Sequence, residues 1–139
     1  RSASAKKAFS FMADDTSRTL ANAERSLATL ERFTRAEVNE ISRAAVIQAF
    51  EFTFEAVWKA FAKRAAQEGD SAPSPKRAMS RAFHYGIIED ESVWLRMLED
   101  RNLTVHTYNE SLAQAIYERV VHVYLPAFTS AFARLRSST

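Results

Sequence analysis

Hydrophobic side chains recur every three or four residues along most of this chain, which is the spacing that places them on one face of an α-helix. The clearest example is an apolar stripe made of Ile47, Phe50, Phe54, Trp58 and Phe61. Phe50, Phe52 and Phe54 also alternate as they would in a β-strand. We interpret the region as helical because the helical period continues on both sides and no turn signal interrupts it. The pattern therefore favours an all-α protein.

Five helical segments are predicted from this periodicity. They cover residues 16–33, 34–67, 75–85, 91–101 and 110–135. The inward positions of the first, fourth and fifth segments are taken by Leu20, Leu27 and Leu30, by Trp94, Leu95 and Leu98, and by Leu112, Ile116, Val120 and Val123. We expect these faces to be buried in one core.

Glycine and proline mark several helix ends. Gly69 can end the second helix, and Ser74 followed by Pro75 can begin the third. Pro126 should kink the fifth helix, since it removes a backbone donor and crowds the preceding turn.

Two further helix starts are suggested by hydroxyl and carboxylate residues three positions apart. The pairs Thr34 and Glu37, and Thr107 and Glu110, look like capping boxes. In a capping box the two side chains bond backbone N–H groups that have no partner inside the helix.

Composition supports a single domain over residues 1–139. Hydrophobic residues make up 47% and charged residues 26%, which argues against an intrinsically disordered chain. Two Gly and three Pro leave few residues for turns, which favours a few long helices over many strands. We expect residues 1–15, before the first predicted helix, to be flexible or not native to the protein.

Cysteine usage and charge restrict the setting and the partners. The absence of cysteine excludes disulfides and thiolate chemistry and fits the cytoplasm, where we expect the protein to act. No apolar run approaches the roughly 20 residues needed to cross a bilayer, so no membrane partner is expected. The formal net charge is +2. That balance allows contact with RNA without demanding it, and we expect no DNA partner.

The segment from Arg101 to Tyr108 carries the most chemistry in the chain. Arg101 can hold a phosphate, His106 can move a proton near neutral pH, and Tyr108 offers a nucleophilic hydroxyl. The Arg-x4-His spacing alone is weak, because arginines are abundant and Arg77 also precedes a histidine, His84. A purely structural interpretation exists as well, in which His106 bonds a carbonyl and Arg101 complements a helix dipole.

Other kinds of site have less support in the sequence. There is no glycine-rich phosphate loop, and the three histidines stand apart from one another, so we expect neither a metal site nor a cofactor. Glu51 and Glu55 are one helical turn apart and could act as paired carboxylates. We favour an ion pair of Glu55 with Lys59 on a polar face, and we interpret the tryptophans and phenylalanines as core residues.

Three segments resemble the signature of nucleotidyltransferase substrate-binding proteins, which belong to the HEPN superfamily (higher eukaryotes and prokaryotes nucleotide-binding). They are IQAFEFTFEAVWK (residues 47–59), GIIEDESVWLRMLEDRNLTVHTY (86–108) and YLPAF (124–128). The segments occur in order, and the resemblance extends over roughly residues 16–135. Three ordered motifs are far more specific than the Arg-x4-His spacing alone.

The resemblance implies an antiparallel up-and-down bundle of four to five helices that forms a homodimer and brings two Arg-x4-His motifs toward one cleft. Many such proteins are toxins paired with a minimal nucleotidyltransferase antitoxin, and the toxins resemble metal-independent ribonucleases that leave a 2',3'-cyclic phosphate on RNA. By this resemblance Arg101 and His106 are catalytic, and Asn102 has a supporting polar role. Tyr108 is then the residue to which the partner transfers AMP, which silences the toxin.

Two other interpretations stay open. The chain could be a non-catalytic subunit that binds a substrate or nucleotide for the nucleotidyltransferase, because a phosphate-binding Arg/His pair looks the same in both cases. It could also be a purely structural helical dimer in which the motif is incidental.

Overall fold

The computed structural model describes residues 3–138, and this range is helical apart from short connections. In chain order the elements are α1 (Ala3–Thr34), α2 (Glu40–Gln67), α3 (Pro75–His84), α4 (Glu91–Leu103), the 3₁₀ turn η1 (Thr104–His106), α5 (Glu110–Arg119), the π turn η2 (Val120–Tyr124) and α6 (Leu125–Ser138). Since α5, η2 and α6 follow one another without a break, the described part forms five helical rods. The predictions of an all-α fold and of five helical segments are confirmed.

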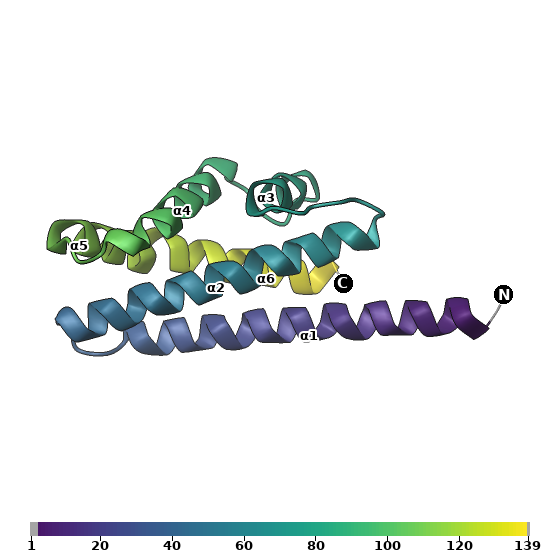
Figure 1. Ribbon diagram of the computed structural model, residues 1–139, viewed down its shortest axis with the longest axis horizontal. Coiled ribbons are helices and arrows are strands. Elements are labelled where there is room, and N and C mark those ends of the chain that lie inside the picture. Colours follow the sequence, from purple (N-terminus) through teal and green to yellow (C-terminus); the bar gives the residue numbers. More distant parts are fainter. Residues whose placement is uncertain (1–2, 139) are drawn as a thin grey trace.

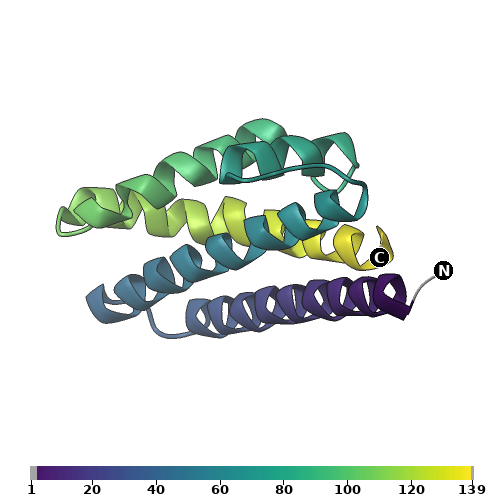
Figure 2. The same ribbon diagram turned by 45° about the vertical axis from the view of Figure 1, so that its right-hand side comes forward.

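The rods pack as an up-and-down bundle (Figure 1). α1 and α2 form an antiparallel hairpin, and α6 returns along the bundle to contact α1. Figure 2 shows that α3 and both ends of the described chain lie at one end of the bundle, whereas the connection from α4 to α5 lies at the other end. The Arg101–Tyr108 segment is therefore at the end away from the chain termini.

α1 begins at Ala3, well before the start predicted at Thr16. The added length is rich in alanine and lysine, which favour helices, but it carries no capping signal from which a start could be predicted. The origin of residues 1–15 stays a prediction, and residues 1 and 2 lie outside the described part of the chain. None of the described helices is both long and apolar enough to cross a bilayer.

α2 begins with a capping box that differs from the predicted one. The Asn39 amide accepts a bond from the Ser42 N–H (2.8 Å), and the Ser42 hydroxyl accepts one from the Asn39 N–H (2.9 Å). The predicted box of Thr34 and Glu37 is wrong, because α1 continues through Thr34 and its hydroxyl donates to the carbonyl of Glu31 (2.7 Å). Thr34 thus belongs to the end of α1, and the chain turns before α2 starts.

The start of α5 also differs from the prediction. Asn109 is the N-cap, and its side chain accepts a backbone N–H of the first turn (3.2 Å). The Thr107 hydroxyl instead donates to the carbonyl of Thr104 (2.9 Å), and Glu110 pairs with Arg43 of α2 (2.8 Å). The predicted capping box of Thr107 and Glu110 is wrong, because each of these side chains bonds a different group.

The predicted ends around α3 are confirmed. The Ser74 hydroxyl accepts the N–H of Arg77 (3.2 Å), and Pro75 is in the first turn of α3. Gly69 follows α2 and Gly86 follows α3, each with φ of 75°. Glycine adopts this left-handed backbone without a Cβ clash, so each residue ends its helix at low cost.

The helix around Pro126 widens into a π turn. Leu125 donates its N–H to the carbonyl of Val120, five residues earlier, instead of four. Pro126 has no N–H, and its ring would crowd the carbonyl of His122 in a regular α-helix. We expected a kink at this proline, and the structure shows a local widening of the preceding turn.

The core is built around the buried face of α2. Phe50 stacks on Tyr124 with ring centroids 5.4 Å apart, and Phe61 packs against Trp94 at 5.2 Å. Trp94 in turn meets Phe128 edge-on at 5.6 Å. These pairs join α2, α4, η2 and α6 in one aromatic cluster, and the cluster supports the elements that carry the Arg101–Tyr108 segment.

Most of the predicted inward residues are buried, with identifiable exceptions. Val123 was predicted inward but is 41% exposed, because the π turn changes the helical register and places Tyr124 in the core. Trp58 is only partly buried, and Phe52 and Phe83 are 40% and 47% exposed. The interpretation of every phenylalanine as a core residue is therefore wrong.

Candidate functional site

The Arg101–Tyr108 segment forms a tight connection between α4 and α5. Arg101 lies in the last turn of α4, and His106 ends η1. The Thr104 hydroxyl donates to the carbonyl of Arg101 (2.7 Å), and the Asn109 N–H donates to the carbonyl of His106 (3.0 Å). These short-range bonds hold the segment close to the end of α4.

The guanidinium of Arg101 is half-buried and points toward α2. Its Nη2 lies 3.3 Å from Oε1 of Glu55, and the other carboxylate oxygen of Glu55 accepts the indole N–H of Trp58 (3.1 Å). The predicted pair of Glu55 with Lys59 is therefore wrong, because Glu55 faces α4. A carboxylate so placed can orient Arg101 while leaving the guanidinium partly open to a phosphate.

His106 and Tyr108 lie together on the surface. The Tyr108 hydroxyl is 3.4 Å from Nδ1 of His106, and the two rings meet almost at right angles with centroids 5.9 Å apart. Tyr108 is 85% exposed, so its nucleophilic hydroxyl is accessible from solvent. His106 is exposed as well, which leaves its imidazole free to exchange a proton with a bound molecule.

Asn102 is exposed on the last turn of α4, and its side chain makes no hydrogen bond to the described residues. Among those residues, no direct bond joins Arg101 to His106 either. The structure thus brings His106 and Tyr108 into contact and places Arg101 nearby in the chain with a different partner. The role of Asn102 stays a prediction.

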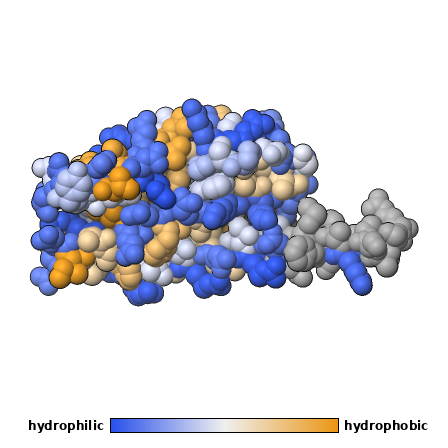
Figure 3. Space-filling view, in the orientation of Figure 1, coloured by the Kyte–Doolittle hydropathy of each residue, from blue (hydrophilic) through white to orange (hydrophobic). Residues whose placement is uncertain are grey.

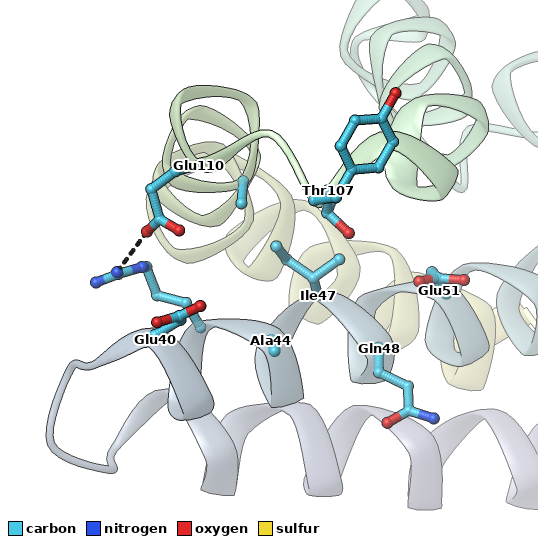
Figure 4. A pocket seen from close by; sticks show the side chains of 10 residues that line it. Glu40, Ala44, Ile47, Gln48, Glu51, Thr107 and Glu110 are labelled. Atoms are coloured by element: carbon cyan, nitrogen blue, oxygen red, sulfur yellow. Dashed lines mark hydrogen bonds and ion pairs between the residues drawn. The ribbon is translucent and has the colours of Figure 1, made fainter.

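A small cavity of about 180 Å³ adjoins the segment and is lined by Thr107 and Tyr108. Figure 4 shows Ile47 and Glu51 of α2 across from Thr107. Glu51 faces this cavity while Glu55 pairs with Arg101, so the two carboxylates have different surroundings. This arrangement does not support the paired-carboxylate interpretation.

Asp100, which precedes Arg101 in α4, belongs to a largely buried polar cluster with Arg119 and Tyr124. Sequence reasoning did not find this cluster. Asp100 is 3% exposed and accepts two bonds from Arg119, from Nε (2.6 Å) and from Nη2 (2.8 Å). It also accepts the hydroxyl of the buried Tyr124. Burial and the bond to Asp100 both raise the pKa of the Tyr124 hydroxyl above its usual value, so Tyr124 stays protonated and donates.

The remaining histidines have ordinary surface roles. His122 pairs with Glu118 one turn earlier (3.0 Å), and His84 packs edge-on against Tyr85. Within the described residues, no group of three acidic or histidine side chains is placed to hold a metal ion.

These site residues lie in a sequence that matches a known family. A family profile described as "nucleotidyltransferase substrate binding protein like" matches residues 18–137, which is most of the chain. The chain belongs to this family. Membership confirms the resemblance seen in the three sequence segments and the HEPN-like character of the fold.

A curated relative from Haemophilus influenzae is named Probable ribonuclease HepT. It is 32% identical to this chain over 82 residues, which cover 55% of this chain and 56% of the relative. The chain thus aligns with little more than half the length of that protein.

Solved structures share the fold. A crystal structure of a protein from Thermus thermophilus is 42% identical, with a TM-score of 0.76 over 82% of this chain and 98% of that one. A Haemophilus influenzae structure, described as the fold of a substrate binding domain of a nucleotidyltransferase, is 25% identical, with a TM-score of 0.62 over 88% and 98%. A mutant MntA–HepT toxin–antitoxin is 16% identical with a TM-score of 0.72 over 89% and 98%, and it supports the fold alone.

Proposed function

We propose that this chain is the toxin of a toxin–antitoxin pair and acts as a metal-independent endoribonuclease. The observation that carries the proposal is the placement of an exposed imidazole, an exposed phenol and an oriented arginine within one short connection at the end of α4. Family membership and the curated relative named as a probable ribonuclease support the same activity. Asn102, Arg101 and His106 are the proposed catalytic residues.

In the proposed reaction, His106 accepts the proton of a ribose 2'-hydroxyl as the 2'-oxygen attacks the adjacent phosphorus. The bond from phosphorus to the 5'-oxygen breaks, and that oxygen leaves with a proton returned by an imidazolium. Arg101 stabilises the negative charge that builds on the phosphoryl oxygens, and Asn102 orients the phosphate. The products are a 2',3'-cyclic phosphate and a free 5'-hydroxyl.

We also propose a homodimer in which two such segments share one cleft. One chain supplies a single Arg/His pair, and a two-fold axis doubles it. Apolar side chains beside the motif support an interface here, since Leu103 is 39% and Val105 is 69% exposed. Figure 3 shows hydrophobic patches within the otherwise hydrophilic surface toward this end of the molecule. Light scattering should give a dimer at micromolar concentration, and a monomer would contradict the shared cleft.

Regulation would act on Tyr108. A partner nucleotidyltransferase would transfer AMP from ATP to the Tyr108 hydroxyl, forming a phosphodiester and releasing pyrophosphate. The exposure of Tyr108 and its contact with His106 support this step, because the added anion would occupy the space beside the catalytic groups. The toxin would be silenced without unfolding.

The decisive experiment expresses the chain alone and compares it with the Arg101→Ala/His106→Ala double variant. Growth arrest and RNA cleavage by the native chain, and their loss in the variant, are the expected results. Arg77→Ala/His84→Ala is a matched control, because both residues are exposed on α3 at the other end of the bundle. Purified protein should cleave RNA in EDTA and leave 2',3'-cyclic ends. Cleavage that survives in the Arg101/His106 variant, or vanishes with chelator, would refute the mechanism.

A second candidate function is a non-catalytic binding subunit of a two-component nucleotidyltransferase. It is favoured by the Haemophilus influenzae structure described as a substrate binding domain and by the partial neutralisation of Arg101 by Glu55. This function predicts that the chain binds RNA or a nucleotide and loses that binding in the Arg101/His106 variant, while no RNA is cleaved. Isothermal titration beside the cleavage assay separates the two.

A further inference from the structure

We propose that Asp100, Arg119 and Tyr124 form a positioning cluster that sets the direction of Arg101. This proposal rests on the proposed function of Arg101. The cluster has no place in the reaction itself, because Asp100 and Tyr124 are buried and the Arg119 guanidinium is bonded to Asp100. It acts through the backbone of the last turn of α4.

The cluster ties the end of α4 to the following rod. Asp100 immediately precedes Arg101, and its carboxylate receives three donors from two residues: two N–H groups of Arg119 and the hydroxyl of Tyr124. Because Asp100 is 3% exposed and Tyr124 fully buried, water cannot replace these donors without opening the core. Charge-assisted bonds of this kind are short and directional, so they fix the backbone at Asp100.

The π turn is what allows both donors to reach one carboxylate. Residues five apart in a regular α-helix point about 140° away from each other, because each residue turns the helix by about 100°. Arg119 and Tyr124 are five apart, and the π turn between them closes its hydrogen bonds over five residues. The two side chains are therefore brought to the same face. π turns inside α-helices are often found at functional sites.

Arg101 is thus held from two directions. Its backbone follows Asp100, which is bonded to Arg119 and η2, and its guanidinium meets Glu55 on α2. The Arg101 Nε atom is buried and has no acceptor in the described part of the chain. The ion pair with Glu55 is therefore the main polar contact of this guanidinium, and its direction also depends on the position of the Arg101 backbone.

A second cluster of the same three residue types provides a matched control. Asp70 accepts the hydroxyl of Tyr85 (2.8 Å) and forms an ion pair with Arg81 (2.7 Å). This cluster joins the connection after α2 to α3, at the end of the bundle away from Arg101 (Figure 2). Removing the Tyr85 hydroxyl therefore tests the loss of a similar bond without affecting the end of α4.

The experiment compares Tyr124→Phe with Tyr85→Phe by steady-state cleavage of RNA and by NMR of the arginine Nε–H groups. Tyr124→Phe keeps the ring that packs on Phe50 and removes only the hydroxyl. We expect at least a tenfold loss of kcat with KM within twofold, and at least tenfold faster solvent exchange of the Arg101 Nε–H. Tyr85→Phe should change neither quantity, although its melting temperature falls.

Two further results decide the proposal. Asp100→Asn keeps the shape of the side chain and should repeat the Tyr124→Phe effect, with circular dichroism confirming that both variants are folded. Unchanged Arg101 exchange in Tyr124→Phe, or equal loss of kcat in Tyr124→Phe and Tyr85→Phe, would overturn the positioning role. If the native protein cleaves no RNA, the proposed function fails, and the exchange measurement still decides whether the cluster positions Arg101.

Discussion

Replacing Glu55 by glutamine tests whether the ion pair with Arg101 serves activity or stability. The substitution keeps the size of the side chain and removes its negative charge. Both partners are partly exposed, with the Arg101 side chain at 30% and that of Glu55 at 37%. Ion pairs exposed to this degree contribute about 0.2–1 kcal/mol. For a domain of this size, such a loss lowers the melting temperature by at most about 5 °C.

The effect on cleavage should be larger than the effect on stability. Without the charge-assisted bond, the Arg101 guanidinium samples other directions, and a displacement of about 1 Å in a catalytic group can cost up to about 100-fold in rate. We expect kcat for RNA cleavage to fall by about 10- to 100-fold, or about 1.4–2.7 kcal/mol in activation free energy. KM should stay the same or fall, because a negative charge has been removed beside an anionic substrate.

The assay measures kcat and KM on a short labelled RNA, together with thermal melting of the same preparation. Glu68→Gln is the matched control, since Glu68 directly follows α2 and pairs with Arg64 of α2 (2.9 Å) near the other end of the bundle. That variant should keep native cleavage. A Glu55→Gln protein with native kcat would refute the reasoning, because Arg101 would then need no carboxylate to act.

Three further predictions concern other parts of the structure. The native chain should gain mass in steps of one AMP when it is incubated with the cognate nucleotidyltransferase, ATP and magnesium, and Tyr108→Phe should not. Equal labelling of the two proteins, measured by intact mass, would exclude Tyr108 as the acceptor. Phe50→Ala should lower the free energy of unfolding in urea by about 3–5 kcal/mol, because Phe50 is fully buried and stacks on Tyr124; a loss under about 1 kcal/mol would contradict that packing. The hydroxyl of Tyr85 lowers the pKa of Asp70, so the stability that Asp70 adds is present above its unfolded pKa of about 3.9 and is lost as the pH falls through the lower folded value. The melting temperature of Asp70→Asn should therefore lie below that of the native chain at pH 7 and approach it below about pH 4, and a constant difference would rule out this linkage.

Sequence alone predicted the helices and those ends that depend on local chemistry. Ser74 and Pro75 begin α3 as expected, and Gly69 ends α2, because each acts on its own backbone within one turn. The caps at Asn39 and Asn109 were not predicted. Several Ser, Thr, Asn and Glu residues compete within each connection, and packing of the flanking helices decides which of them lies at the first turn.

The candidate site was predicted in part for a similar reason. The Arg101–Tyr108 segment is continuous in sequence, so its exposure at the end of a helix could be foreseen. The partners of Arg101 and of its neighbour Asp100 come from α2 and from α5 and η2, and these pairings depend on how the helices cross. Tyr124 lies four residues after Val120, so periodicity places it inward. Its shared partner with Arg119, five residues earlier, could not be read from that period.

The π turn also determines where this chain can tolerate insertions and deletions. A deletion of one residue within Val120–Tyr124 can be absorbed there, because the π turn holds one residue more than an α turn and its loss would leave a regular α-helix with α6 in nearly its present direction. The same deletion within α6 would instead rotate the residues after it by about 100°, and the buried Phe132 and Leu135 would turn away from the core. The connection over residues 68–74 has no such constraint on its length, because it ends one helix and begins another. Within the last rod, the chain therefore tolerates the loss of a residue at the π turn and not in the regular helix that follows it.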